Sequence, residues 1–366
     1  MDIYIPLGLL LAFICFVFRR QNSGVVFTLV FVVILLFSAI RFGFGPDYYS
    51  YWDIWESVRG MDTEDYLGVG SGIEPLFLKF LSLFPRYTYF IILTSILLVS
   101  SYYWLFRRYV NMNDLWIVIL FIFFNVNCLI SNYVALRSSI SAILFILAFH
   151  FLENRSIRNT IVYLLLILLA SQIHSSSIVL LVFVLLNHKN NSVLFSWYFV
   201  IGAGVFAIIT VLIGNNLLVS WGSSFLIDNI ESFDRYRDYD VGNVSTSVMA
   251  LLFRVISLVI FVFLVHSAKE ENDKQMVLVY KIAVVAASLQ LVFGQSLISD
   301  RYLLFLNPFY ITAIVHSLRK RVDSIRAIML VLVLGISVYL FWVKMGKDYS
   351  VSFLHYQTIF TQQIIP

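Results

Sequence analysis

The residues best suited to chemistry are basic side chains at the ends of long uncharged runs: Arg41, Arg137, His174, Arg254 and Arg301. A planar guanidinium group binds phosphate oxygens in a bidentate geometry, and several such groups together suit a diphosphate. An imidazole can take a proton from a hydroxyl group near neutral pH. These residue types together predict a site that binds a diphosphate and moves a proton.

The spacing of these residues indicates how deep they lie. Between 14 and 17 residues separate Arg137, Arg254 and Arg301 from the next charge at the other end of each run, and His174 has similar spacing on both sides. Helices of this length measure about 21–26 Å, against roughly 30 Å of hydrocarbon in a bilayer. Because lipid does not tolerate buried charges, we expect these four side chains to line a polar cavity open to the outside. The alternative is that each arginine extends to the lipid headgroups.

A second group of candidates lies in the first long loop, where a turn of two glycines and one proline is followed directly by Asp47. Aromatic and acidic side chains then alternate on a segment that we expect to be an interfacial helix, and the aromatic ones include Tyr48, Tyr51, Trp52 and Trp55. Rings that stack on sugars, beside carboxylates that accept sugar hydroxyls, predict carbohydrate binding. For the two tryptophans, an ordinary aromatic belt at the membrane surface is the alternative.

Glu74 is a further candidate carboxylate. It precedes Pro75 at the start of a short apolar run, residues 74–84. Proline is favoured in the first turn of a helix, and the run is too short to cross a membrane. We therefore expect a re-entrant or surface helix there. Glu74 could act in catalysis, or it could only complement the positive end of that helix.

The elements that position these residues must be membrane helices. Of the 366 residues, 60% are hydrophobic and 13% are charged, and the mean hydropathy is +0.89. A soluble chain of this length could not bury so much apolar surface in one core. We predict an all-α, polytopic membrane protein in which residues 1–366 form a single transmembrane domain. About twelve spans are expected, near residues 3–18, 24–40, 87–106, 115–133, 138–152, 159–173, 175–187, 193–213, 247–265, 276–294, 303–317 and 325–343.

The distribution of basic residues predicts the orientation. Alternate short loops are rich in arginine and lysine, which is typical of cytoplasmic loops. The two longest loops, residues 41–86 and 214–246, are rich in acidic and aromatic residues and are expected to face outward, together with both termini. Within the second loop, the densely charged residues 228–240 could be a solvated loop or a lid over the cavity.

Other classes of site are not indicated. Cys15 and Cys128 lie inside apolar runs, so we expect neither a disulfide nor a metal cluster. The outward loops contain no Asp-x-Asp pair and no His/Cys cluster with the spacing of metal ligands. A formal net charge of +4 is too small to indicate nucleic-acid binding.

Taken in order, these motifs resemble the EpsG/Wzy-like family of exopolysaccharide and O-antigen polymerases. The matching elements, which cover residues 41 to 302, are Arg41 with Gly45, Asp47-Tyr48 and Tyr51; Glu74-Pro75-Leu76-Phe77; Arg137 at the start of a helix of small residues; His174-Ser175-Ser176 at a helix break; and Arg301-Tyr302 before a late span. The resemblance implies a metal-independent glycosyltransferase without a cofactor and with a GT-C-like arrangement of helices around an outward-facing cavity.

The resemblance also implies the substrates and the location. The donor would be an undecaprenyl-diphosphate-linked oligosaccharide, and the acceptor the non-reducing-end hydroxyl of a second lipid-linked repeat. The site would face the periplasm from the bacterial inner membrane. Membrane lipid and a chain-length regulator are further candidate partners.

Roles can be assigned to the candidate residues as hypotheses. The diphosphate would be held by Arg41, Arg137 and Arg301, with Arg254 as a fourth candidate. The glycan would contact Tyr48, Tyr51, Trp52, Trp55 and Tyr302. For the base that deprotonates the acceptor we slightly favour His174 over Asp47, and Glu74 is a third catalytic candidate. An O-antigen ligase with the same donor, and a lipid-linked oligosaccharide flippase, are the alternative functions.

Overall fold

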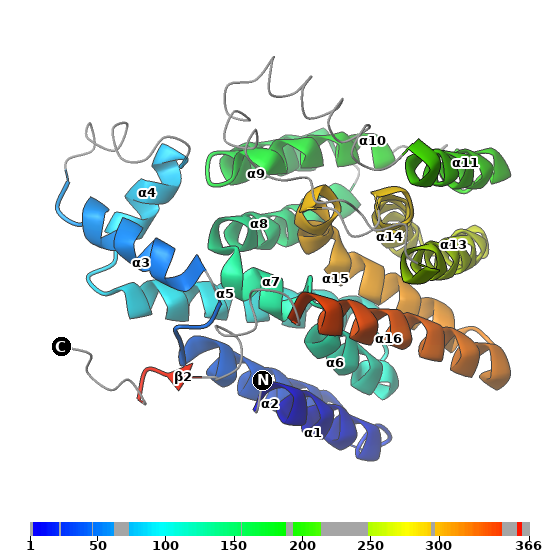
Figure 1. Cartoon of the computed structure of the whole chain (residues 1–366), viewed down its shortest axis with the longest axis horizontal. Coiled ribbons are helices and arrows are strands. Elements are labelled where there is room, and N and C mark those ends of the chain that lie inside the picture. Colours follow the sequence, from blue (N-terminus) through cyan, green and yellow to red (C-terminus); the bar gives the residue numbers. More distant parts are fainter. Residues whose placement is uncertain are drawn as a thin grey trace. The chain divides into compact units, whose positions relative to one another are not determined.

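The computed structural model describes residues 3–21, 23–45, 47–61, 73–154, 156–187, 193–213, 248–293, 297–345 and 357–360, and these are mostly helical (Figure 1). The chain divides into two compact units. The first comprises Met1–Asn187 and Ile314–Pro366, and the second comprises His188–Ala313. The loop 214–246, with its predicted lid, lies outside the described residues, and most of the loop 41–86 lies within them.

The elements of the first unit are α1 (Tyr4–Val17), α2 (Ser23–Ala39), β1 (Arg41–Phe42), α3 (Asp47–Val58), α4 (Pro75–Ser82), α5 (Tyr87–Tyr109), η2 (Met112–Asp114), α6 (Leu115–Phe124), α7 (Leu129–Val134), α8 (Leu136–Glu153), α9 (Ile157–Ser171), η3 (Ser175–Val182), α10 (Phe183–Leu186), α16 (Asp323–Met345) and β2 (Gln357–Thr358). Those of the second unit are α11 (Trp197–Ile213), α13 (Val248–Lys269) and α14 (Lys274–Phe293). Helix α15 (Leu297–Arg319) begins in the second unit and ends in the first.

The predicted all-α membrane class is confirmed. In the part of the chain that the structure describes, five helices are long and apolar enough to cross a membrane, and six more apolar helices are 10–17 residues long. Each predicted span falls on a helical segment. The number of spans, the GT-C-like arrangement and the single transmembrane domain remain predictions.

Two of the predicted spans are less regular than expected. Span 115–133 consists of two helices, α6 and α7, because the chain leaves the helix at Asn125, whose side-chain oxygen accepts a hydrogen bond from the Asn127 N–H at 3.1 Å. Asparagine side chains compete in this way with the helical hydrogen bonds of the backbone. Span 175–187 begins as the 3₁₀ helix η3 and becomes α-helical only at Phe183.

Helix α8 lies at the centre of the packing in the first unit. It contacts α5, α7, α9 and η3. Small residues in its first half, including Ser138, Ser139 and Ser141, are buried and allow neighbouring helices to approach closely. A similar close approach joins α1 to α6, where a Cβ atom at Gly8 would lie 2.6 Å from the ring of Phe123.

Helices α3 and α4 pack side by side next to the start of α5 (Figure 1). The buried face of α3 carries Tyr48, Tyr51, Trp55 and Val58, a spacing of three or four residues that places them on one side of the helix. Its opposite face is polar and exposed. The buried face joins a core with apolar residues of α4, α5 and α8, so aromatic packing holds the helix. Its interfacial position stays a prediction.

The chain turns sharply before α3. Gly43 and Gly45 have φ values of 60° and 93°, which residues with a side chain rarely adopt. The preceding strand β1 pairs antiparallel with β2, with Arg41 opposite Thr358. The segment near the C-terminus thus lies beside the first long loop, as expected if both are on one side of the membrane.

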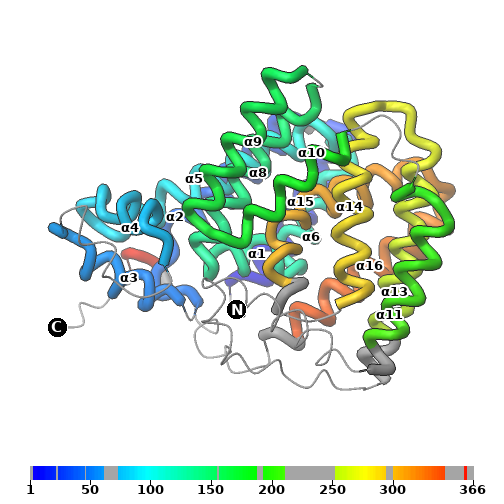
Figure 2. The backbone as a smooth tube through the Cα atoms, turned by 90° about the horizontal axis from the view of Figure 1, so that it is seen from above, coloured from blue at the N-terminus to red at the C-terminus, as the bar shows by residue number. Residues whose placement is uncertain are grey.

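In the second unit, α14 packs against both α13 and α11 (Figures 1 and 2). All three are apolar along most of their length, and most residues of α14 are buried. Lys281, in the first half of α14, is 3% exposed. A buried lysine in an apolar helix is unusual, and Lys281 was not among the predicted site residues.

Candidate functional site

An ion pair between Glu74 and Arg137 forms the centre of the candidate site. The Nη1 atom of Arg137 donates to the Oε2 atom of Glu74 at 2.7 Å. The side chains of Glu74 and Arg137 are 12% and 19% exposed, so water screens them only in part. Glu74 precedes α4 and Arg137 is in the first turn of α8. The pair joins the start of the short helix α4 to a predicted membrane helix.

The other carboxylate oxygen of Glu74 binds the start of η3. The backbone N–H of Ser175 donates to Oε1 at 2.7 Å, and the Nδ1 atom of His174 lies 3.9 Å from the same oxygen. His174 is 7% exposed and has extended backbone geometry where the chain passes from α9 to η3. An N–H at the start of a helix has no helical partner, so an anion there is favourable.

Glu74 makes no side-chain hydrogen bond to its own helix α4. The carboxylate is directed instead to Arg137 and Ser175, which are 63 and 101 residues further along the chain. Its contacts therefore go beyond the simple helix-end role that the sequence left open.

Tyr51 completes the cluster from the side of α3. Arg137 Nε donates to its hydroxyl oxygen at 3.4 Å. Burial raises the pKa of Tyr51, an effect that the charge of Arg137 partly offsets. Asp47 lies one helical turn earlier, is exposed, and is near enough to raise the pKa of Tyr51 slightly. The structure thus brings four predicted site residues close together, and Asp47 lies at the edge of this group.

The charge of Glu74 follows from its neighbours. Burial by itself raises the pKa of Glu74, but the positive charge of Arg137 and the N–H of Ser175 lower it by more, and His174 contributes in the same direction. The net pKa is below the ordinary value, so Glu74 is a carboxylate at neutral pH. The cluster therefore holds one full negative charge directly against one guanidinium group.

Arg41 has a different environment. It is 2% exposed, and its Nη1 atom donates to the Ser38 carbonyl and to the Ser95 hydroxyl, each at 2.6 Å. Its guanidinium carbon lies 4.4 Å from the ring centre of Tyr133. These contacts tie the end of α2 to α5 and α7. The proposed diphosphate role of Arg41 stays a prediction, and a structural role accounts for the contacts seen.

Arg254 and Arg301 belong to the second unit. Arg254 is 8% exposed, and its Nη1 atom donates to the carbonyls of Leu291 and Val292 in the last turn of α14. Helix C-termini leave such carbonyls without helical partners, and a cation satisfies them. Arg254 thus fixes the end of α14. Arg301 and Tyr302 are half-buried at the start of α15.

The predicted glycan-binding aromatics mostly contact one another. Tyr48 and Trp55 are buried, and the Trp55 Nε1 atom donates to the Phe84 carbonyl at 2.9 Å. Trp52 is half-buried against Tyr48, Trp55 and Tyr87. Of these rings, Trp52 retains the most access to solvent on α3, and glycan contacts by the others stay predictions.

Two cavities are present near the predicted cytoplasmic side, with volumes of about 520 and 460 Å³. Their linings include Lys269 with Trp197 in one case and Arg107 with Tyr103 in the other, and no predicted site residue. Among the described residues, no group of three His, Cys, Asp or Glu side chains could hold a metal ion.

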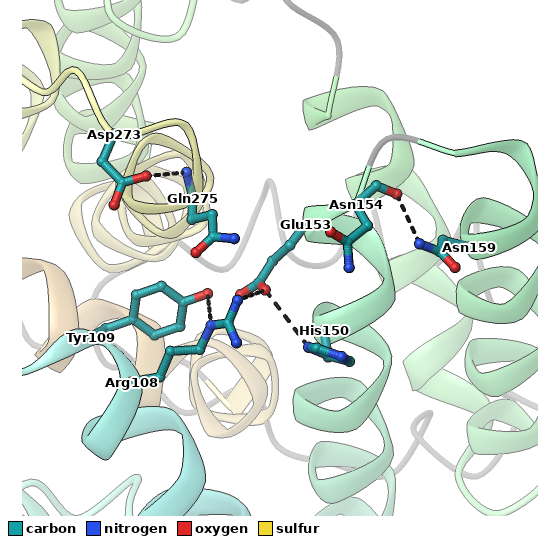
Figure 3. Close-up of polar contacts among 8 residues, drawn as sticks. All are labelled: Arg108, Tyr109, His150, Glu153, Asn154, Asn159, Asp273 and Gln275. Atoms are coloured by element: carbon teal, nitrogen blue, oxygen red, sulfur yellow. Dashed lines mark hydrogen bonds and ion pairs between the residues drawn. The ribbon is translucent and has the colours of Figure 1, made fainter.

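A second ion pair lies at the other end of α8 (Figure 3). Arg108 Nη2 donates to Glu153 Oε2 at 2.7 Å, and Arg108 Nε donates to the hydroxyl of Tyr109. His150 Nδ1 is 3.8 Å from the same Glu153 oxygen. Glu153 was not among the predicted site residues. Helix α8 is therefore tied by ion pairs at both ends.

The helical fold defines a multi-pass membrane protein with a basic and acidic cluster at the predicted outer end of α8. The EpsG family model matches residues 24–358, nearly the whole chain, and the chain belongs to this family. No curated protein and no solved structure matches it. The match to the family model confirms the predicted EpsG-like family.

Proposed function

We propose that the protein is a membrane glycosyltransferase that polymerises lipid-linked oligosaccharide repeats into a surface polysaccharide. Membership of the EpsG family supports a role in polysaccharide polymerisation. The observation that carries the proposal is the cluster of Glu74, Arg137 and His174, which combines an anion-binding guanidinium with groups able to move a proton. The reaction would take place at the periplasmic face of the bacterial inner membrane.

The donor in this proposal is an undecaprenyl-diphosphate-linked oligosaccharide. The acceptor hydroxyl oxygen attacks the anomeric carbon of the donor sugar and forms the new glycosidic bond. The bond between that carbon and the diphosphate oxygen breaks, and its electron pair leaves with undecaprenyl diphosphate. The acceptor proton passes to a base of the protein. Arg137 stabilises the charge that develops on the leaving diphosphate, so the reaction needs no metal ion.

The base must lie near the acceptor hydroxyl. Glu74 contacts Arg137 directly and His174 lies beside Glu74, whereas Asp47 is exposed one turn from Tyr51. The exposed position of Asp47 and the partial exposure of Trp52 suit contacts with the sugar hydroxyls and ring faces of a glycan. The substrate therefore lies across α3 and the start of α8 in this proposal.

A ligase would use the same donor and differ only in the acceptor. The test is a null strain together with an in vitro reaction. Loss of the protein should leave single repeats attached to lipid, and this accumulated lipid-linked repeat should be converted by the purified protein into a ladder of longer chains with release of undecaprenyl diphosphate. Release of the diphosphate only when a different acceptor lipid is added would instead identify a ligase.

A further inference from the structure

The Glu74 carboxylate occupies a place suited to a phosphate group. One of its oxygens accepts from the Arg137 guanidinium and the other accepts from the Ser175 N–H, both at 2.7 Å, with His174 beside the second oxygen. A guanidinium, a helix-start N–H and an imidazole are the donors that proteins use to bind phosphate. In this structure the protein's own carboxylate accepts from the guanidinium and the N–H, and the imidazole Nδ1 lies 3.9 Å from it.

We propose that Glu74 is an internal substitute for the substrate's phosphate, and that the donor diphosphate displaces it from Arg137 and Ser175 and so frees it to be the general base. This inference rests on the proposed function. It assigns the base to Glu74 rather than to His174 or Asp47, and it makes the base available only when the donor is bound.

The charges explain why the exchange would activate Glu74. In the free protein, Arg137 and the Ser175 N–H hold the pKa of Glu74 below its ordinary value, which makes the carboxylate a weak base. A bound diphosphate would take over both donors and bring its own negative charge close to Glu74. Both changes raise the affinity of the carboxylate for a proton. The released carboxylate then accepts the acceptor's proton as the glycosidic bond forms.

The location of Glu74 allows such a movement. It lies immediately before the short helix α4, and its side chain makes no hydrogen bond to that helix. Only side-chain torsions of Glu74 need to change for the carboxylate to leave Arg137. The residues that would bind the diphosphate, in contrast, are part of α8 and of the start of η3, which pack against each other.

The competing explanation is that Glu74 is a fixed structural partner that orients Arg137. The two explanations predict opposite effects of Glu74→Gln on anion binding. If Glu74 competes with the anion, its neutralisation strengthens binding, and if it positions the guanidinium, its loss weakens binding. Pyrophosphate is the probe, titrated without metal into the purified full-length protein and measured by calorimetry.

We expect Glu74→Gln to bind pyrophosphate about tenfold more tightly than wild type, because a charge-assisted contact no longer has to be broken. Arg137→Ala should bind at least about tenfold more weakly. Glu56→Gln is the matched control, since it removes one negative charge from the exposed face of α3. It should change affinity by less than about twofold.

Glu74→Asp gives a second test if the glutamine variant does not fold. Its side chain is one methylene shorter and cannot keep both 2.7 Å contacts, so pyrophosphate should again bind more tightly although the charge is retained. Turnover of lipid-linked repeats by Glu74→Gln should fall by about 10²–10⁴-fold while anion affinity rises. A merely structural residue would lower both quantities.

Weaker or unchanged pyrophosphate binding in both Glu74 variants would overturn the exchange, while the polymerase function would stand. Unchanged binding in Arg137→Ala would overturn the exchange together with the proposed diphosphate site. Full turnover by Glu74→Gln would overturn the assignment of the base.

Discussion

Arg137 offers the sharpest test of the candidate site, because its structural and catalytic roles can be separated with a second substitution. In the structure its guanidinium contacts the Glu74 carboxylate and the Tyr51 hydroxyl at once. Arg137→Ala removes the diphosphate-binding group and also leaves the partly buried Glu74 charge without this partner. The double variant Arg137→Ala/Glu74→Gln removes the charge as well. It therefore repairs the electrostatic defect without restoring a diphosphate site.

The expected losses of stability and activity follow from the contacts. Breaking a well-buried ion pair lowers folding stability by about 3–5 kcal/mol. Because this pair is partly exposed and the Ser175 contact remains, we expect Arg137→Ala to lose about 2 kcal/mol of stability. The double variant should recover about half of the stability that Arg137→Ala loses. Two charge-assisted hydrogen bonds to a leaving diphosphate contribute about 3–5 kcal/mol to the transition state, so turnover should fall about 10²–10⁴-fold in Arg137→Ala. The double variant should be at least as inactive, because it also lacks the Glu74 carboxylate proposed as the base.

Stability is measured by thermal unfolding in detergent, and activity by the length distribution of the polymer and by turnover of purified lipid-linked repeats. Arg137→Lys should remain well folded but poorly active, because a single ammonium cannot reproduce the bidentate fork. Arg86→Ala is the control, since Arg86 is an exposed arginine at the start of α5. It should behave like wild type in both assays.

Two results would refute this reasoning. Normal-length polymer from Arg137→Ala would exclude a diphosphate role for Arg137. Recovery of activity in the double variant, in parallel with its stability, would mean that Arg137 acts only by neutralising Glu74 and that Glu74 is not the base.

Three further predictions concern other parts of the chain. A cysteine introduced at Ser57 should react with an impermeant thiol reagent in intact spheroplasts, and one introduced at Asn272 should not. The background should be low because both native cysteines are buried. The reverse pattern would invert the proposed topology. Arg254→Ala should lower stability by about 2–4 kcal/mol, because its guanidinium binds carbonyls at the end of α14, while the amount of polymer per folded molecule should change less than about twofold. Loss of polymer from a stable variant would support the diphosphate role of Arg254. Ionisation of Glu74 should stabilise the fold fully above pH about 4.5, and this stabilisation should be lost as the pH falls through the lowered pKa of Glu74 in the folded state. The thermal unfolding temperatures of wild type and Glu74→Gln should therefore converge in acid. A difference that is constant with pH would show that folding does not stabilise the charge of Glu74.

The sequence determined the class of protein and most of the helices. Long apolar runs are informative because a membrane helix must pair the hydrogen-bonding groups of its backbone within the helix and must cross the fixed thickness of the bilayer. The amphipathic helix α3, the glycine turn before it and the helix start at Pro75 were also predictable, since each depends on local residue types. The order of the motifs was enough to identify the family.

Only the tertiary structure shows which groups each of the basic residues contacts. Spacing along a helix gives the depth of a residue, but neither the direction in which it points nor the helices that pack around it. Arg41 and Arg254 were grouped with Arg137 by their positions in the runs, yet the first contacts Ser38 and Ser95 and the second contacts the end of α14.

The contacts of Glu74 could not be inferred from the sequence for the same reason. Its partners Arg137 and Ser175 are 63 and 101 residues away, and the sequence around Glu74 is equally consistent with an ordinary helix start. The packing of α8 with α9 and η3 brings these partners together. The sequence therefore determined which side chains were available, and helix packing determined that a carboxylate occupies the site proposed for the diphosphate.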